Sequence, residues 1–528
     1  MLSLQALLSL AVSLGLLTTS QAGPVWNPVV RTSLGEVSGN QGALARRFTL
    51  PYAKPPVGSL RFKHPESLDR FEGLYDGTQL PQVCTQVDPG NAPEPLGSED
   101  CLYMNIYTPL NVPVDRKLPV FVWVHGGSFT SGGIAGIDGS KLASAQNMIV
   151  VTVQYRLGVF GWLKQPRLVL DGNDGLRDLI KALEVVKQDI GAFGGDPSLV
   201  TLAGQSSGAQ MVNALLSTPS ASSLFNRAIL QSAPLDYAPQ PAAVAQNVGF
   251  AFSKASKAHG RAVLLGKSAK ELVAAQYNIA ALAALNQLPG VPQAEPFNVV
   301  LDDKLVSGDG KSIVNSGKQV IYTTVKDEAC VAVYTGTQVA QGALNVSSSD
   351  FEGLVGYSFP ERAHPILDSK LYDPTPRDDE DAIAEKLVQL TTDFAWTCPT
   401  QRNALAAAGA STVYLAEFDL GVTAPLNAYV PLCSGKVGHE DDIAAVFNTP
   451  TAPHSSAQTA LVNEVQARWG AFARTGSPNP SSSSYPTWPA LSTSAGGLQV
   501  LRLGATSKGG SSIGTSQRTD ACKLYSSI

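Results

Sequence analysis

A serine between two glycines stands where an apolar run ends and a helical pattern begins. Residues 204–208 read Gly-Gln-Ser-Ser-Gly, and residues 199–203 before them are apolar enough for a buried strand. After them, apolar residues recur at helical spacing as far as Thr218-Pro219. The glycines are expected to let the chain turn sharply, leaving the Ser206 hydroxyl exposed at the turn. This arrangement, a nucleophile elbow, predicts that Ser206 attacks a carbonyl carbon.

A serine hydroxyl is a weak nucleophile and needs a base that a third group orients. Of the six histidines, His439 is the best candidate, because residues 435–443 form a polar loop that leads into the apolar residues 444–447. His125 ends another apolar run and precedes two glycines, which suits backbone N–H groups that point into a site. The remaining histidines are expected at the surface: His64, His259, His364 and His454.

The elements that must position these groups alternate along the chain. Buried strands are predicted by four apolar runs, at residues 119–124, 148–154, 199–203 and 228–231. Between the second and third runs, residues 174–190 place leucine, isoleucine and valine on one helical face. Strands that alternate with helices predict an α/β protein whose parallel sheet is covered on both faces.

Several stretches resemble signatures of the type-B carboxylesterase/lipase family, which includes cholinesterases and fungal lipases. Residues 193–208 are similar to its serine signature and residues 98–107 to its second signature. Residues 48–62 look like its N-terminal wrap, and because their prolines exclude a central strand we expect a surface segment. The resemblance spans nearly the whole chain, and secreted fungal members are the nearest in character. It implies an α/β-hydrolase fold with a single catalytic domain, residues 23–528, and hydrolysis of carboxylic esters without a cofactor.

The resemblance also implies roles for individual residues. It matches His439 to the family's catalytic histidine, which stands three residues before an acid, here Asp442. It matches Glu328 to the catalytic acid, whereas the residues alone would favour its neighbour Asp327; the order serine, acid, histidine is that of α/β-hydrolases. Residues 122–129 look like the family's oxyanion loop, with backbone N–H donors from Gly127, Ser128 and Ser207. The family more often has glycine at position 128, so a positive φ there would strain the serine.

The N-terminus predicts export. Residues 3–17 are almost wholly apolar and small residues follow, so residues 1–22 are expected to be a secretory signal peptide. No other stretch is long and apolar enough to cross a bilayer, and we expect a secreted, extracellular protein without a membrane anchor. The formal charge of −5 lacks the basic excess of a nucleic-acid binder. The acidic residues 378–381 are expected at a helix N-terminus rather than at a cation site.

Six cysteines in a secreted chain allow three disulfides. The family resemblance implies two pairs, Cys84 with Cys101 and Cys398 with Cys522. Cys330 and Cys433, which lie near the proposed acid and histidine in sequence, either pair or stay free as buried thiols. Asn345, in Asn-Val-Ser, is the one sequon for an N-linked glycan. The chain has no His-Glu-x-x-His helix and no Cys/His ligand spacing, so no metal site is expected.

Two features bear on the substrate, which is expected to be a small-molecule or lipid ester. Residues 85–100 form a short loop with three prolines and no tryptophan, whereas fungal lipases of the family carry a longer apolar lid there and cholinesterases a cation-binding tryptophan. Gln205 replaces a glutamate that is common in relatives. We therefore expect a carboxylesterase with an open entrance; lipase, steryl esterase and feruloyl esterase activities stay open, and a non-catalytic adhesion role is a distant alternative. The alanine-rich residues 235–300 predict helices that either wall the pocket or only pack.

Overall fold

The structure is a computed structural model. It describes residues 28–111, 117–237, 239–284, 295–306, 317–341, 348–376, 379–449, 452–492 and 498–527. The predicted signal peptide, residues 1–22, and the sequon at Asn345 lie outside these ranges. Within them, no helix has the length and apolar character needed to cross a membrane.

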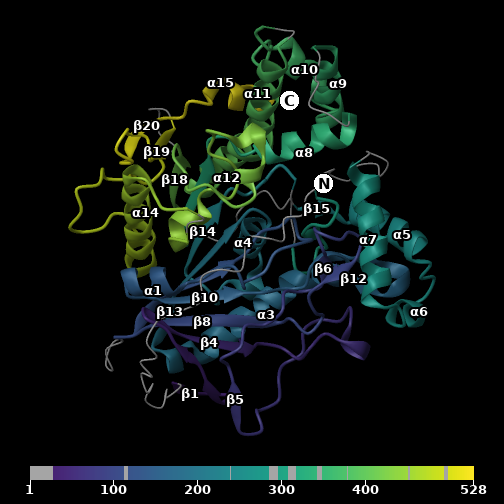
Figure 1. The fold of residues 1–528 in the computed structure, drawn as a ribbon, viewed down its shortest axis with the longest axis vertical. Helices are drawn as coiled ribbons and strands as arrows, with labels where there is room; N and C mark the ends of the chain where they lie inside the picture. Colours follow the sequence, from purple (N-terminus) through teal and green to yellow (C-terminus); the bar gives the residue numbers. More distant parts are fainter. Residues whose placement is uncertain are drawn as a thin grey trace, which may run out of the picture.

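The central element is a sheet of eleven strands among the described residues, in the spatial order β20-β19-β18-β17-β14-β13-β9-β10-β8-β4-β3 (Figure 1). In chain order the strands are β3 (Asn40–Gln41), β4 (Ala45–Pro51), β8 (Tyr103–Pro109), β9 (Leu118–Val124), β10 (Ile149–Val153), β13 (Gly195–Gln205), β14 (Arg227–Gln231), β17 (Gln319–Val325), β18 (Thr412–Phe418), β19 (Gln499–Leu503) and β20 (Ser512–Thr515). Neighbours run parallel from β10 to β19, and the antiparallel pairs of this sheet lie towards its two edges. The prediction of a large, mostly parallel sheet is confirmed.

Helices cover both faces of this sheet because its central strands are apolar on both sides. In β9, Val122 belongs to one core cluster and Trp123 to another. The first cluster includes side chains of α3 (Asp174–Asp189) and α4 (Ser207–Leu216), and the second includes α1 (Ser140–Gln146), α13 (Ile443–Phe447) and α14 (Ser456–Thr475). Strands that are apolar throughout are what a parallel sheet buried on both faces requires.

The predicted elements around residue 206 are present. The helix expected at residues 174–190 is α3, which passes into a 3₁₀ turn at Ile190–Phe193. β13 is longer than the apolar run that predicted it, because residues 195–198, among them Asp196 and the exposed Ser198, extend it at its start. The helix after the serine, α4, ends at Leu216, ahead of Thr218-Pro219 as the proline signal indicated.

The expectation of a surface segment at residues 48–62 is wrong for its first part. Residues 45–51 form β4, which pairs with β8 along its whole length. Phe48, Leu50 and Tyr52 are buried. The error comes from the weight given to proline: Pro51 is the last residue of the strand, where its missing N–H interrupts no central ladder, and its strand lies near the sheet edge.

The alanine-rich insertion is helical, as its pattern predicted. It contains α5 (Ala242–Ser256), α6 (Arg261–Leu265) and α7 (Ala269–Ala284), on the right of Figure 1. α7 packs on α2 (Gly158–Trp162), where the Gln276 side chain accepts a hydrogen bond from the Val159 N–H at 3.0 Å. These helices therefore brace the loop that follows β10.

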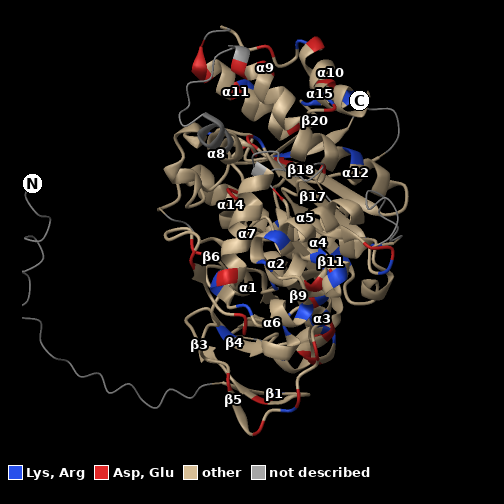
Figure 2. Cartoon of the chain, turned by 90° about the vertical axis from the view of Figure 1, so that its right-hand side faces the viewer, with Lys and Arg blue, Asp and Glu red and all other residues tan. Residues whose placement is uncertain are grey.

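A second group of helices lies at the top of Figure 1 around its own apolar cluster. It comprises α8 (Cys330–Gln341), α9 (Ser348–Ser358), α10 (Ala363–Asp368), α11 (Glu380–Thr391), α12 (Cys398–Ala408) and α15 (Thr519–Ser527). Asp379 caps α11 by accepting a hydrogen bond from the Ala382 N–H at 3.0 Å. The acidic run therefore begins a helix as expected, with residue 378 outside the described part. Figure 2 shows basic and acidic residues interspersed along the chain.

Three disulfides join the described parts of the chain. Cys84–Cys101 closes the loop before β8, and Cys398–Cys522 ties α12 to α15, as the family resemblance implied. The open question about the remaining two cysteines is resolved, because Cys330 and Cys433 form the third disulfide.

Candidate active site

Ser206 stands between β13 and α4 in a strained conformation, with φ 56° and ψ −129°. Its N–H donates to the Gln231 carbonyl at the end of β14, at 2.9 Å. The two glycines contribute by their lack of a side chain: a Cβ on Gly204 would lie 2.6 Å from the Gly208 carbonyl carbon, and one on Gly208 would lie 2.3 Å from the Val124 oxygen. The glycines were expected to make the turn possible, but the positive φ is that of the serine itself.

His439 and Glu328 lie together, although 111 residues separate them. The His439 Nδ1 is 2.6 Å from a Glu328 carboxylate oxygen, and the other oxygen of Glu328 accepts a hydrogen bond from the Val325 N–H at 2.9 Å. Burial lowers the pKa of His439, but the hydrogen bond and the charge of Glu328 outweigh it and raise that pKa to about 9. Glu328 thus fixes the proton on Nδ1 and stabilises the imidazolium.

Asp327, the acid that the residues alone favoured, has another contact. Its carboxylate accepts a hydrogen bond from the Val437 N–H at 3.1 Å, and its own N–H donates to the Val437 carbonyl at 2.9 Å. Asp327 therefore holds the loop that carries His439, while Glu328 contacts the imidazole.

The second imidazole nitrogen, Nε2, is directed towards the elbow. It lies 3.1 Å from the side-chain nitrogen of Gln205, the residue directly before Ser206. Because Nδ1 carries its proton towards Glu328, Nε2 is free to accept one, here from the Gln205 amide. The donor to Nε2 in this structure is therefore the Gln205 amide.

The loop after β9 packs directly against the elbow. A Cβ on Gly126 would lie 2.9 Å from the Ser206 Cβ, and the Phe129 N–H donates to the Ser207 hydroxyl at 3.3 Å. Gly127 has φ 113°, and Ser128 has φ 50°, so serine occupies the strained position anticipated from the sequence. The structure thus brings the three proposed oxyanion donors, Gly127, Ser128 and Ser207, to the neighbourhood of Ser206.

His125 supports this loop from inside. Its ring stacks on Tyr155 with 4.5 Å between centroids, and its Nδ1 lies 2.8 Å from the Gly126 carbonyl. Burial lowers the pKa of His125 to about 4, so the ring is neutral at physiological pH. The other histidines lie away from this site: His64, His259 and His364 are exposed and His454 is half-buried.

Sequence reasoning missed the residues that hold the His439 loop. The Asn427 amide donates to the His439 carbonyl and to the Asp441 carboxylate, each at 2.8 Å, and Asp441 also accepts from the Gly438 N–H at 2.8 Å. A Cβ on Gly438 would lie 2.8 Å from the Cys330 sulfur, so the third disulfide presses on the same loop. The position of Asp441 beside the histidine was a usable signal, but nothing in the sequence pointed to Asn427.

Comparison with known proteins identifies the family of this chain. The profile described as the Carboxylesterase family matches residues 26–524. The chain belongs to the carboxylesterase family. It is 31% identical over 485 residues to the para-nitrobenzyl esterase of Bacillus subtilis, covering 87% of this chain and 92% of that protein. It is also 31% identical over 524 residues to Carboxylesterase 1C of Rattus norvegicus, covering 92% of each.

Solved structures agree with this family. A thermophilic PNB esterase superposes with a TM-score of 0.78 at 28% identity, over 94% of this chain and 100% of that one. The α/β-hydrolase fold is thereby confirmed, and the chain is a carboxylic ester hydrolase. The special nearness to fungal members that the sequence suggested stays a prediction.

An aromatic wall adjoins the imidazole of this carboxylesterase. Trp396 lies 5.5 Å from His439, and Tyr237 lies 6.5 Å from Trp396, between ring centroids. Trp396 belongs to a π-helical turn, Thr392–Thr397, that widens the junction of α11 and α12. Such turns are frequent at functional sites. An apolar surface is therefore available beside the proposed base.

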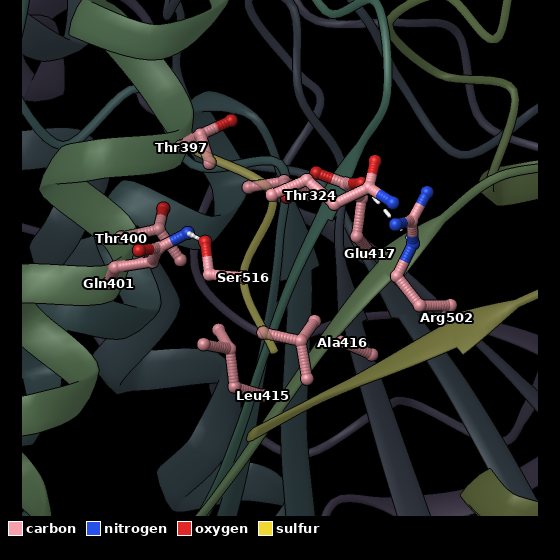
Figure 3. A pocket seen from close by; sticks show the side chains of 11 residues that line it. Thr324, Thr397, Thr400, Gln401, Leu415, Ala416, Glu417, Arg502 and Ser516 are labelled. Carbon is pink, nitrogen blue, oxygen red and sulfur yellow. Dashed lines mark hydrogen bonds and ion pairs between the residues drawn. The ribbon is translucent and has the colours of Figure 1, made fainter. Parts of the chain in front are cut away.

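A separate polar cavity lies between α12 and the strands β17, β18 and β19 (Figure 3). Thr397, Thr400, Glu417 and Arg502 line it, and the buried hydroxyls of both threonines have no hydrogen-bond partner among the described residues. None of the residues of the Ser206 site lines this cavity. Buried hydroxyls in a small polar cavity of this kind are commonly satisfied by water. Within the described residues, no group of His, Cys, Asp or Glu is arranged to hold a metal ion.

Proposed function

We propose that this carboxylesterase works through a Ser206-His439-Glu328 triad. The observation that carries the proposal is the 2.6 Å contact between His439 Nδ1 and Glu328, with the opposite nitrogen of the ring directed at the elbow. This is the geometry in which an acid orients an imidazole for proton transfer from serine.

In the proposed reaction, His439 takes the proton of Ser206 as the hydroxyl oxygen attacks the ester carbonyl carbon. The negative charge on the tetrahedral oxygen is met by the N–H groups of Gly127, Ser128 and Ser207. His439 then gives its proton to the departing alcohol, which leaves an acyl-enzyme. A water molecule, deprotonated by His439, attacks that acyl group, and the acid leaves as Ser206 recovers its proton.

We also propose that the protein is secreted. The signal-like residues 1–22 support this, as do the three disulfides, since disulfides persist in oxidising compartments. The Asn-Val-Ser sequon at Asn345 would then be a candidate for N-linked glycosylation in the secretory pathway.

The substrates proposed are small-molecule esters that reach an entrance without a long lid. Residues 84–101 are closed by a disulfide and carry only a short hairpin, β6 (Gln86–Val87) with β7 (Pro95–Leu96). Two relatives are named para-nitrobenzyl esterase and cocaine esterase. Each name states an ester on which that relative acts. Their chemistry supports small aryl and alkyl esters for this chain.

The test is hydrolysis of p-nitrophenyl esters from acetate to palmitate, together with methyl ferulate, by the wild type and Ser206→Ala. Ser222→Ala, at an exposed serine beyond α4, is the matched control. We expect turnover of the short esters by the wild type and the control, and its loss in Ser206→Ala. A preference for palmitate or ferulate would instead indicate a lipase or feruloyl esterase. A folded wild type that hydrolyses none of them would overturn the proposal.

A further inference from the structure

A buried carboxyl group that the proposed mechanism does not use lies beside the nucleophile. Glu295 is 3% exposed. One of its oxygens, Oε2, accepts hydrogen bonds from the Gln210 amide at 2.9 Å and from the Asn298 amide at 3.1 Å. Gln210 is in the first turn of α4, and its N–H donates to the Ser206 carbonyl at 3.0 Å. Glu295 therefore packs on the helical turn that begins at Ser206.

Its charge reaches groups on several sides of the site. It interacts electrostatically with the His439 imidazole, with Tyr155 and with Tyr237. Tyr155 supports the oxyanion loop through its stacking on His125, and Tyr237 belongs to the aromatic wall beside His439. Glu295 is thus near enough to the Ser206 site for its charge to act on these three groups.

The two oxygens of the Glu295 carboxyl group differ in their hydrogen bonds. Both hydrogen bonds from described residues go to Oε2, and Oε1 has none from them. Burial raises the pKa of Glu295 to about 7, although the Gln210 hydrogen bond and the His439 charge act against it. As far as the described residues go, Oε1 can therefore accept a further hydrogen bond. A purely structural link between residues 295–298 and α4 would need only the Oε2 side, which a glutamine could supply equally well.

We propose that Glu295 is a specificity-determining residue that accepts a hydrogen bond from a hydroxyl group of the ester substrate. The substrate class is then a hydroxylated ester rather than a purely hydrocarbon one. The inference rests on the proposed function of the Ser206 site, since it concerns the substrate that this site receives.

The test uses pairs of esters that differ only in a hydroxyl and a methyl group. On the acyl side the pair is p-nitrophenyl 3-hydroxybutanoate and p-nitrophenyl 3-methylbutanoate; on the alcohol side it is 2-hydroxypropyl butyrate and 2-methylpropyl butyrate. The quantity measured is the ratio of kcat/KM within each pair, for the wild type, Glu295→Gln and Glu295→Met. Comparing enzyme variants on the same pair cancels the intrinsic reactivity of the esters.

We expect the hydroxyl-to-methyl ratio of one pair to fall by about 10-fold or more in Glu295→Met, since an unpaired buried polar group is discriminated strongly. The pair that responds identifies the acyl or the alcohol side. Asn298→Ala is the control, because it weakens the Oε2 side and leaves Oε1 in place, so the ratio should be retained even if thermal stability falls.

An equal loss on both members of each pair would mean a structural role and would overturn the inference, as would ratios that match the wild type in both Glu295 variants. In either case turnover of the methyl esters leaves the proposed function intact. If the wild type hydrolyses none of the four esters and none of the p-nitrophenyl series, the proposed function fails and the inference fails with it.

Discussion

The pairing of His439 with Glu328 predicts how the rate of this enzyme depends on pH. The imidazole is buried, which lowers its pKa, yet the hydrogen bond and charge of Glu328, with smaller contributions from Glu440 and Asp442, raise the pKa to about 9. Only the neutral imidazole can take the Ser206 proton. The kcat/KM of the wild type should therefore fall as the pH drops below about 9.

Glu328→Gln removes the charge while keeping the shape of the side chain. With burial still acting, the pKa of His439 should drop to its ordinary 6.5 or lower. A fall of that size corresponds to about 3 kcal/mol of lost imidazolium stabilisation. The amide also donates to Nδ1, which places the imidazole proton on Nε2 and blocks proton transfer from Ser206. By analogy with serine hydrolases, the maximal rate should fall by about 10⁴-fold.

The assay is kcat/KM for p-nitrophenyl butyrate between pH 5 and 10, corrected for uncatalysed hydrolysis. Asp327→Asn is the control, since its carboxylate accepts a hydrogen bond from the Val437 N–H rather than from the imidazole, and the substitution should leave the pH profile in place. The reasoning is refuted if Glu328→Gln loses activity with the acid limb of its profile at the wild-type pH. In that case Glu328 would not be the group that sets the pKa of His439.

Two further predictions concern strain and restraint near the site. Ser128→Gly should remove the strain of the positive φ of 50°. Glycine also makes the unfolded chain more flexible, which offsets part of this gain, so the free energy of unfolding should rise by up to about 1 kcal/mol. A lower Tm in thermal unfolding would contradict this. Replacing Cys330 and Cys433 together by alanine should cost about 2–5 kcal/mol and also lower kcat, because the disulfide packs against Gly438 in the His439 loop. Removing Cys398–Cys522, which closes a loop of similar length, should cost similar stability but leave kcat unchanged. The stability of both variants is measured by urea unfolding. Equal losses of kcat in the two variants would refute the role of Cys330–Cys433 in positioning the His439 loop.

The sequence predicted best where a local pattern decides the structure. The apolar run at residues 199–203 and the spacing of leucines in residues 174–190 specify β13 and α3, because each pattern has the period of its element. At residues 48–51 we predicted a surface segment from the prolines in this stretch and after it, although these residues form a strand. Proline disfavours the middle of a sheet but not the last position of a strand, and β4 uses that position.

In the candidate site, too, some features could be predicted from the sequence and others could not. The order of Ser206, Glu328 and His439, read with the family resemblance, predicted a triad, and the structure brings His439 Nδ1 to 2.6 Å from the Glu328 carboxylate. The supporting contacts could not be predicted, because they join residues without any period or motif. Asp442, for example, is fully buried and accepts a hydrogen bond from Gln231, which is 211 residues earlier in the chain. Such pairs depend on how the strands and loops meet in three dimensions.

The register of two strands explains why the proposed nucleophile and the proposed oxyanion loop meet. β9 and β13 are parallel neighbours, and Val124 is opposite Gly204. Because both strands leave the sheet at the same level, the loop that begins at His125 and the elbow at Ser206 emerge side by side. Their positive-φ residues, each costing about 1–3 kcal/mol, persist because close backbone contacts leave little room to relax: a Cβ on Gly208 would meet Val124, and one on Gly126 would meet Ser206. The strain is thus localised where two buried strands fix the backbone on both sides.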